Sequence, residues 1–183
     1  MVTETTIELP AESRLFRRLL NGEFALSAEI TPPVSGGAQA LLDKALPLKG
    51  CVDAVNVTDG ASARVHMSSL AASAILIANG IEPVTQFTCR DRNRIALMGD
   101  LLGASALGVH NVLMLHGDDP TAGDQPMAKP VFDLTSVELI DVAATMTSDG
   151  VLPSYGVKMT GGGIEATSLP ITDPPRFFVG TAD

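Results

Sequence analysis

The strongest constraint in this sequence is the alternation of short apolar segments with longer segments of helical periodicity. The apolar segments end in polar residues, glycine or proline, as buried strands do. They cover residues 24–30, 52–57, 81–87, 110–116 and 176–182. Helices are predicted over residues 10–20, 38–48, 66–78, 92–107 and 135–147, and a small hairpin within residues 148–175. This order predicts a parallel sheet whose strands are apolar on both faces.

The repeat of about 28 residues fits either a doubly wound sheet or a (β/α)₈ barrel. A dinucleotide-binding sheet would carry a GxGxxG turn after its first strand, and none is found there. Polar residues instead follow nearly every strand, as at the rim of a barrel, where the active site is built. The sequence therefore predicts an α/β (β/α)₈ TIM barrel, incomplete with about five of its eight strands. Residues 1–183 are expected to form the N-terminal portion of this single barrel domain, with no second domain.

Composition excludes several classes of function. The formal net charge is −9, from 12 basic and 21 acidic residues, and no basic cluster of the kind that binds nucleic acid is present. Cys51 and Cys89 lie far apart without metal-ligand spacing, which predicts no metal site and a reducing compartment. No segment approaches the roughly 18 consecutive apolar residues of a membrane span, and the first residues do not resemble a signal peptide. The cytoplasm is the expected location.

Glu29 is the first candidate for chemistry. It lies at the end of the first predicted strand, between Ala28 and Ile30 and before a Pro-Pro turn. A carboxylate at a partly desolvated rim favours its protonated form, which suits a general acid. The alternative is a solvated rim glutamate or the partner of a nearby arginine.

Asp118 is the second candidate, in the turn after the fourth predicted strand. Gly117 permits a close approach of the backbone, and Pro120 ends the turn. Asp118 is expected either to contact the polar edge of a ligand ring or simply to form an Asx-turn.

Two further groups of polar residues face the predicted rim. The turn Thr58-Asp59-Gly60-Ala61 offers a hydroxyl and backbone N–H groups to an anionic or carbonyl ligand group, although a turn after a strand needs no function. Gln86 and Thr88 alternate along the third strand and so point to one face. That face is either the barrel lumen, where they await a ligand, or the core, where they hydrogen-bond internally.

Taken together, these segments resemble the methylenetetrahydrofolate reductase family. The matching segments are AEITPP (28–33), VNVTDGASARVHMSS (55–69), GIEPVTQFTCRDRNR (80–94), GVHNVLMLHGDDP (108–120) and PPRFFVGTAD (174–183). They occur in the order of the family and span most of residues 24–183.

The resemblance implies a barrel that carries FAD at its rim and reduces 5,10-methylenetetrahydrofolate to 5-methyltetrahydrofolate, with NAD(P)H as the reductant. Glu29 matches the catalytic acid of the family, which assists opening of the imidazolidine ring. Asp118 matches the acid near the flavin pyrimidine and the bound pterin. The positions that match flavin contacts are Thr58, Asp59, Gly60, Ala61, Gln86, His116 and Gly117.

Two departures from the family pattern bear on the cofactor. Bacterial members commonly carry arginine where His116 stands, and an aromatic residue near Ala182. Loss of a fixed cation removes a charge-assisted contact with the FAD pyrophosphate, so retention of the flavin is in question.

Two other classes of function remain open. One is a non-catalytic partial barrel that needs a partner chain, or a second copy of this chain, to complete it. The other is a pterin-binding barrel that transfers a methyl group, against which the flavin-type motifs argue.

Overall fold

A computed structural model describes residues 13–153, 157–158, 164–165 and 168–182 of this chain. Five parallel strands form one sheet in the order β1-β2-β3-β4-β9. They are β1 (Ser27–Ile30), β2 (Ala54–Val57), β3 (Pro83–Thr88), β4 (Asn111–Leu115) and β9 (Phe178–Thr181). All five predicted strands are therefore confirmed. The mixed α/β architecture is consistent with part of an α/β barrel, and among the described residues β1 and β9 each pair with one strand.

Among the described residues, five α-helices accompany the sheet. They are α1 (Arg14–Leu20), α2 (Gln39–Ala45), α3 (Ser69–Ala78), α4 (Arg94–Ala106) and α5 (Ser136–Ser148). Three short 3-10 helices follow strands or helices: η1 (Leu46–Leu48), η2 (Ala61–Ala63) and η3 (Pro120–Ala122). The helix predicted over 38–48 changes to 3-10 geometry at Leu46, because Pro47 has no backbone N–H for the α-helical ladder. Within the described ranges, no helix is long and apolar enough to cross a membrane.

Side-chain caps set where the longer helices begin. The Ser68 hydroxyl accepts a hydrogen bond from Ala71 N, so α3 begins at Ser69 rather than at residue 66. At α5, Thr135 Oγ1 accepts from Glu138 N at 3.2 Å, while Glu138 Oε2 accepts from Thr135 N at 2.8 Å. This reciprocal pair is a capping box, and it satisfies two backbone donors that the helix leaves open.

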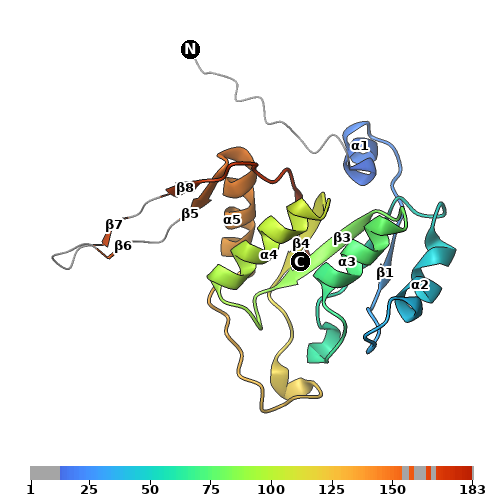
Figure 1. Ribbon diagram of the computed structural model, residues 1–183, viewed down its shortest axis with the longest axis horizontal. Helices are drawn as coiled ribbons and strands as arrows, with labels where there is room; N and C mark the ends of the chain where they lie inside the picture. Colours follow the sequence, from blue (N-terminus) through green and yellow to red (C-terminus); the bar gives the residue numbers. More distant parts are fainter. Residues whose placement is uncertain (1–12, 154–156, 159–163, 166–167, 183) are drawn as a thin grey trace.

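One face of the sheet packs on helices, and Figure 1 shows α3, α4 and α5 lying along it. Alternate residues of each strand point to this face, among them Val55, Val57, Phe87 and Met114, which are fully buried. Leucines of α3, α4 and α5 fill the space between the two layers. Each such side chain stabilises the fold by about 1.5–3 kcal/mol through removal of apolar surface from water. The other face of the strands is left to form the site.

Helix α1 covers the amino ends of the strands, opposite to the predicted rim. The carboxylate of Glu82 accepts hydrogen bonds from the backbone N–H groups of Arg14 and Leu15, at 2.8 and 3.0 Å. The ring of Phe16 packs on that of Phe178 at the start of β9, with centroids 5.3 Å apart. These contacts fasten the leading helix to the base of the sheet, where a barrel carries stabilising rather than catalytic residues.

The hairpin predicted within residues 148–175 is confirmed. Strand β5 (Val151–Pro153) pairs antiparallel with β8 (Ser168–Pro170), and β6 (Val157–Lys158) pairs with β7 (Ile164–Glu165). Figure 1 shows these strands in orange and red, projecting beyond α5 and away from the five-stranded sheet. They take no part in the site.

Candidate active site

A cavity of about 520 Å³ lies at the carboxyl ends of β1, β2, β3 and β4. Parallel strands end at the same edge, so residues far apart in the sequence meet there. The predicted site residues that line the cavity are Glu29, Thr58, Asp59, Ala61, Gln86, His116, Gly117 and Asp118. Gly60 is the exception, because it lines a neighbouring cavity. The structure therefore brings the predicted residues together around one space.

Glu29 is held by a neighbour two strands away. Gln86 Nε2 donates a hydrogen bond to Glu29 Oε2 at 3.2 Å, across β2. Of the two faces considered for Gln86 and Thr88, the structure places both on the cavity face. The expectation of a partly desolvated Glu29 is wrong, since this residue is exposed. The reason is that β1 is an edge strand of the described sheet, so no further strand shields its outer side.

Asp59 acts as an anchor for its own loop. Its Oδ2 accepts hydrogen bonds from Thr88 N at 2.9 Å and Thr88 Oγ1 at 3.1 Å, and it also pairs with Arg92. These three donors tie the turn after β2 to the end of β3. The carboxylate of Asp59 is thus engaged within the protein, although the residue borders the cavity.

The backbone after Asp59 follows a path that few residues adopt. Gly60 has φ +61°, and a side chain there would place Cβ 2.3 Å from Arg90 Nη2. Ser62 and Ala63 also have positive φ, at 57° and 52°. Non-glycine residues in this region cost about 1–3 kcal/mol each, and such strain gathers at functional sites. The strained turn places Ala61 and Ser62 at the cavity.

Asp118 and Asp119 divide the two roles considered for the turn after β4. Asp119 Oδ1 accepts hydrogen bonds from Thr121 N at 2.8 Å and Thr121 Oγ1 at 2.7 Å, and so caps η3. These bonds lower the pKa of Asp119 below its ordinary value. Asp118 lines the cavity, and no described residue donates a hydrogen bond to its carboxylate. Asp119 is therefore the turn former, and Asp118 faces the cavity.

Gly117 and His116 complete this side of the cavity. Gly117 has φ +95°, and a Cβ there would lie 3.0 Å from both Arg90 Cβ and Thr88 Cβ, so glycine allows the turn to pass close to β3. The His116 ring stacks on Phe132, with centroids 4.3 Å apart and an interplanar angle of 15°. His116 Nδ1 also lies 3.0 Å from Gly117 O. His116 is exposed at the edge of the cavity. These two contacts fix the position of its ring.

Arg90 is a site residue that the sequence analysis missed. It is 4% exposed, borders both cavities and donates from Nη1 to Gly60 O at 3.2 Å. Its hydrogen bond to Asp91 raises its pKa, with smaller support from the charges of Asp59 and Asp118. In the sequence it belongs to a short basic stretch interrupted by an acid, which signals an exposed surface. Its position just past the end of β3 is the signal that could have identified it.

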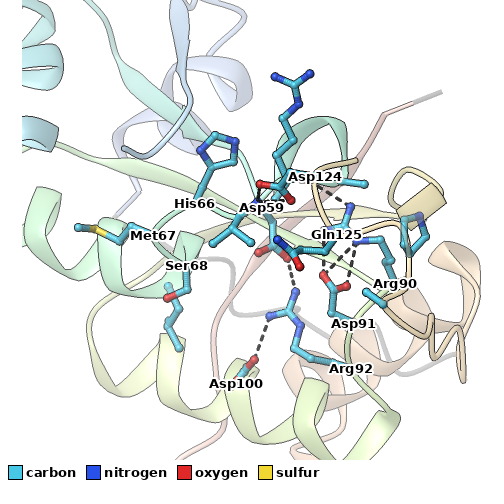
Figure 2. Close-up of a pocket in the computed structure, with 17 residues that line it drawn as sticks. Asp59, His66, Met67, Ser68, Arg90, Asp91, Arg92, Asp100, Asp124 and Gln125 are labelled. Carbon is cyan, nitrogen blue, oxygen red and sulfur yellow. Dashed lines mark hydrogen bonds and ion pairs between the residues drawn. The ribbon is translucent and has the colours of Figure 1, made fainter. Parts of the chain in front are cut away.

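The neighbouring cavity, of about 470 Å³, is shown in Figure 2. Arg92 bridges Asp59 and Asp100 beside it, with Nη1 2.9 Å from Asp100 Oδ2. Across the cavity, Asp124 accepts from Val65 N at 3.1 and 3.2 Å. Its four acidic side chains are all engaged by protein donors. This network of ion pairs and hydrogen bonds connects the loops that follow β2, β3 and β4.

Two buried polar atoms on the cavity side of β2 lack a partner. They are Asn56 Oδ1 and Thr58 Oγ1, and no hydrogen bond to either is found among the described residues. Thr58 is 5% exposed. An unsatisfied buried donor or acceptor costs about 1–3 kcal/mol, so a ligand that pairs with these atoms would recover that free energy. The structure thus leaves two buried oxygens beside the cavity without a hydrogen-bond partner among the described residues.

Among the described residues, no group of three or more His, Cys, Asp or Glu side chains is placed to hold a metal ion. Cys51 and Cys89 are free thiols, the first exposed and the second buried. Burial raises the pKa of Cys89 to about 11, which keeps it protonated and unreactive.

The parallel sheet and the polar cavity at its carboxyl edge define an α/β protein whose candidate site lies at the strand ends. A comparison with family models matches residues 14–152 to methylenetetrahydrofolate reductase. The chain belongs to this family, whose members are oxidoreductases of folate one-carbon metabolism. A search of curated proteins finds no match.

Proposed function

We propose that this chain forms part of the catalytic barrel of an enzyme that reduces 5,10-methylenetetrahydrofolate to 5-methyltetrahydrofolate, with FAD as cofactor and NAD(P)H as reductant, in the cytoplasm. The observation that carries the proposal is the cavity at the strand ends, where the residues that match the functional positions of the family lie together. Membership of the family supports a reductase acting on a folate.

The residues of the cavity fit a flavin. An isoalloxazine ring offers carbonyl and ring N–H groups, which complement the unpaired Thr58 hydroxyl and the open Asp118 carboxylate. Gly117 carries no side chain that would narrow this part of the cavity, and Ala182 also lines the cavity. Thr58, Ala61, Gln86, His116, Gly117 and Asp118 would hold the ring system, while Asp59 and Gly60 shape the loop. When bound, FAD supplies the carrier that accepts a hydride from NAD(P)H and passes it to the folate.

Arg90 supplies a buried positive charge at this cavity. The departure at His116 removes a cation that bacterial relatives commonly carry, and the nearly buried Arg90 guanidinium borders the same space. A fixed positive charge stabilises a bound anionic group in a site of low dielectric constant. We propose that Arg90, although it is paired with Asp91, assists binding of the flavin in place of the missing cation.

Glu29 is proposed as the acid of the folate half-reaction. Gln86 holds Oε2, which leaves Oε1 to carry the proton. Glu29 would give this proton to the nitrogen that leaves as the five-membered ring opens. The exposure of Glu29 allows the folate to reach it from the open side of the cavity. Asp118, in the turn after β4, would accept hydrogen bonds from the pterin ring.

The test compares the two half-reactions in Glu29→Gln. Folate reduction should fall by at least about 100-fold, which is the usual contribution of a general acid, while reduction of the flavin by NAD(P)H stays nearly intact. The control is Glu23→Gln, since Glu23 is an exposed glutamate paired with Arg18 away from the cavity. Equal losses in both half-reactions would assign Glu29 a structural role. A purified protein with no flavin spectrum and no NAD(P)H oxidation would instead favour the methyl-transferring or non-catalytic alternatives.

A further inference from the structure

Asn56 occupies a central place in the cavity, although no motif drew attention to it. It lies on β2 in register with Glu29 on β1, so the two residues are direct neighbours across the strands. It lines the cavity together with Glu29 and Thr58. Its Oδ1 atom is buried and has no hydrogen-bond partner among the described residues.

The polar side chains around the cavity are directed to groups other than Asn56 Oδ1 in this structure. The carboxylates of Glu29, Asp59 and Asp118 are acceptors when ionised. The amide of Gln86 donates to Glu29. The guanidinium of Arg90 donates to Asp91 and to Gly60. None of these groups bonds to Asn56 Oδ1, which leaves this oxygen for a donor from outside the protein.

A second asparagine shows what a structural amide looks like in this fold. Asn111, at the start of β4, accepts from Ser13 Oγ at 2.7 Å. Its Nδ2 donates to Glu82 Oε1 at 3.0 Å and to Pro83 O at 3.1 Å. Both ends of this amide are engaged by the protein, whereas the buried oxygen of Asn56 is not. The contrast separates an amide that stabilises the fold from one kept at a cost in stability.

We propose that Asn56 is a ligand-recognition residue whose Oδ1 accepts a hydrogen bond from a ring N–H of the bound heterocycle, beside Glu29. The inference rests on the proposed function, because the flavin and the reduced pterin both carry ring N–H groups. Since side chains of alternate residues share one face of a strand, Asn56 and Thr58 present their unpaired oxygens to the same space. A site with a buried acceptor selects for a ligand that brings the donor and rejects one that lacks it.

The experiment compares Asn56→Leu with Asn111→Leu in the full-length polypeptide. Urea unfolding without ligand is measured first, then titrations with FAD and, separately, with 5-methyltetrahydrofolate. For Asn56→Leu, the urea midpoint should equal or exceed that of the unsubstituted protein, because an unpaired polar atom gives way to an apolar one of similar size. Its affinity for one of the two ligands should fall by at least about tenfold. The ligand whose affinity falls, FAD or 5-methyltetrahydrofolate, is the one that donates to Asn56. Asn111→Leu should lower the urea midpoint.

Each remaining outcome overturns the inference. A lower urea midpoint or loss of folding in Asn56→Leu would assign Asn56 a structural role like that of Asn111. Unchanged affinity for both ligands would show that no ligand donor reaches Oδ1. Failure of the unsubstituted protein to bind either ligand would instead overturn the proposed function itself. The variant Asn56→Asp, which keeps an acceptor at this position, should bind the identified ligand more tightly than Asn56→Leu.

Discussion

Gln86 Nε2 donates a hydrogen bond to Glu29 Oε2 at 3.2 Å, and this bond joins β3 to β1 over the intervening strand. Gln86 is 6% exposed, whereas Glu29 is exposed. A buried amide thus fixes the direction of an accessible carboxyl group. In the proposed reaction this contact orients the acid before the folate binds.

Gln86→Leu should impair the folate half-reaction. Loss of a hydrogen bond to a charged group costs about 1.5–3 kcal/mol, which predicts a decrease of roughly 10- to 100-fold in the rate of folate reduction. Stopped-flow measurement of both half-reactions checks this. Gln39→Leu is the matched control, because Gln39 donates to the Asp43 carboxylate at 2.8 Å on the surface of α2. If both substitutions change the rate of folate reduction equally, Gln86 has no specific role in the site.

Asp118→Asn should weaken folate binding and alter the midpoint potential of the flavin. The reason is that the Asp118 carboxylate faces the cavity without a protein donor, so its charge acts on the ligands. The expected loss of folate affinity is about tenfold or more, as for a charged hydrogen bond. Asp119→Asn is the control, since it loosens the η3 cap without touching the cavity. If affinity and potential stay unchanged in Asp118→Asn, Asp118 has no ligand role.

Arg90→Lys should destabilise the protein although it conserves the charge. Lysine cannot bond Asp91 and Gly60 together as the planar guanidinium does. The loss of buried hydrogen bonds predicts a decrease of about 1–3 kcal/mol in the free energy of unfolding, read from urea denaturation. Arg64→Lys, at an exposed position, should change it by less than about 0.5 kcal/mol. Similar values for the two variants would contradict the bridging role of Arg90.

The ion pair of Arg94 and Asp133 predicts part of the loss of folding stability at low pH. Hydrogen bonds from Arg94 lower the pKa of Asp133 from its ordinary 3.8 to about 2. The folded chain therefore binds fewer protons than the unfolded chain over this range, so the stabilisation is present above about pH 4 and is lost as the pH falls towards 2.

Asp133→Asn should flatten this part of the stability curve, measured by urea unfolding between pH 5 and 2 in steps of about half a unit. The effect is modest because about a third of both side chains is exposed to solvent. Asp43→Asn, on α2, should leave the slope unchanged. If the free energy of unfolding of Asp133→Asn still falls as steeply between pH 5 and 2, other groups cause the loss of stability in acid.

The two outer strands predict how residues 1–183 behave in isolation. Among the described residues, β1 and β9 each have one partner, and Phe24 and Leu26 before β1 are 84% and 48% exposed. Open apolar edges pair with other chains. We expect residues 1–183 alone to associate on size-exclusion chromatography and to show no turnover, and about three further βα units to give a closed, monodisperse and active barrel.

Leu26→Lys tests this edge directly, because a charge next to an edge strand opposes its pairing with another chain. It should reduce association of residues 1–183, whereas Ile95→Lys on α4, also at an exposed apolar residue, should not. A monodisperse, active chain of residues 1–183 would contradict the open-edge interpretation.

The sequence alone determined the order of the strands and helices and the residues that end each strand. These features are local, since apolar periodicity and capping residues such as Ser68 and Thr135 act within a few positions. The polar residue after each strand, from Glu29 to Asp118, could also be predicted, because all parallel strands end at one edge. Their meeting in a single cavity follows from that rule.

Tertiary structure decided the rest, because it depends on register and on the paths of the loops. The sequence does not reveal that the carboxylate of Asp59 is taken up by Thr88 and Arg92, or that Arg90 turns back into the cavity. It also does not show that Asn56 lies unpaired beside Glu29 while Asn111 is fully paired. Both asparagines lie in similar apolar segments. Only the groups brought in from other parts of the chain, such as Ser13 and Glu82 at Asn111, determine which of the two is free to bind a ligand.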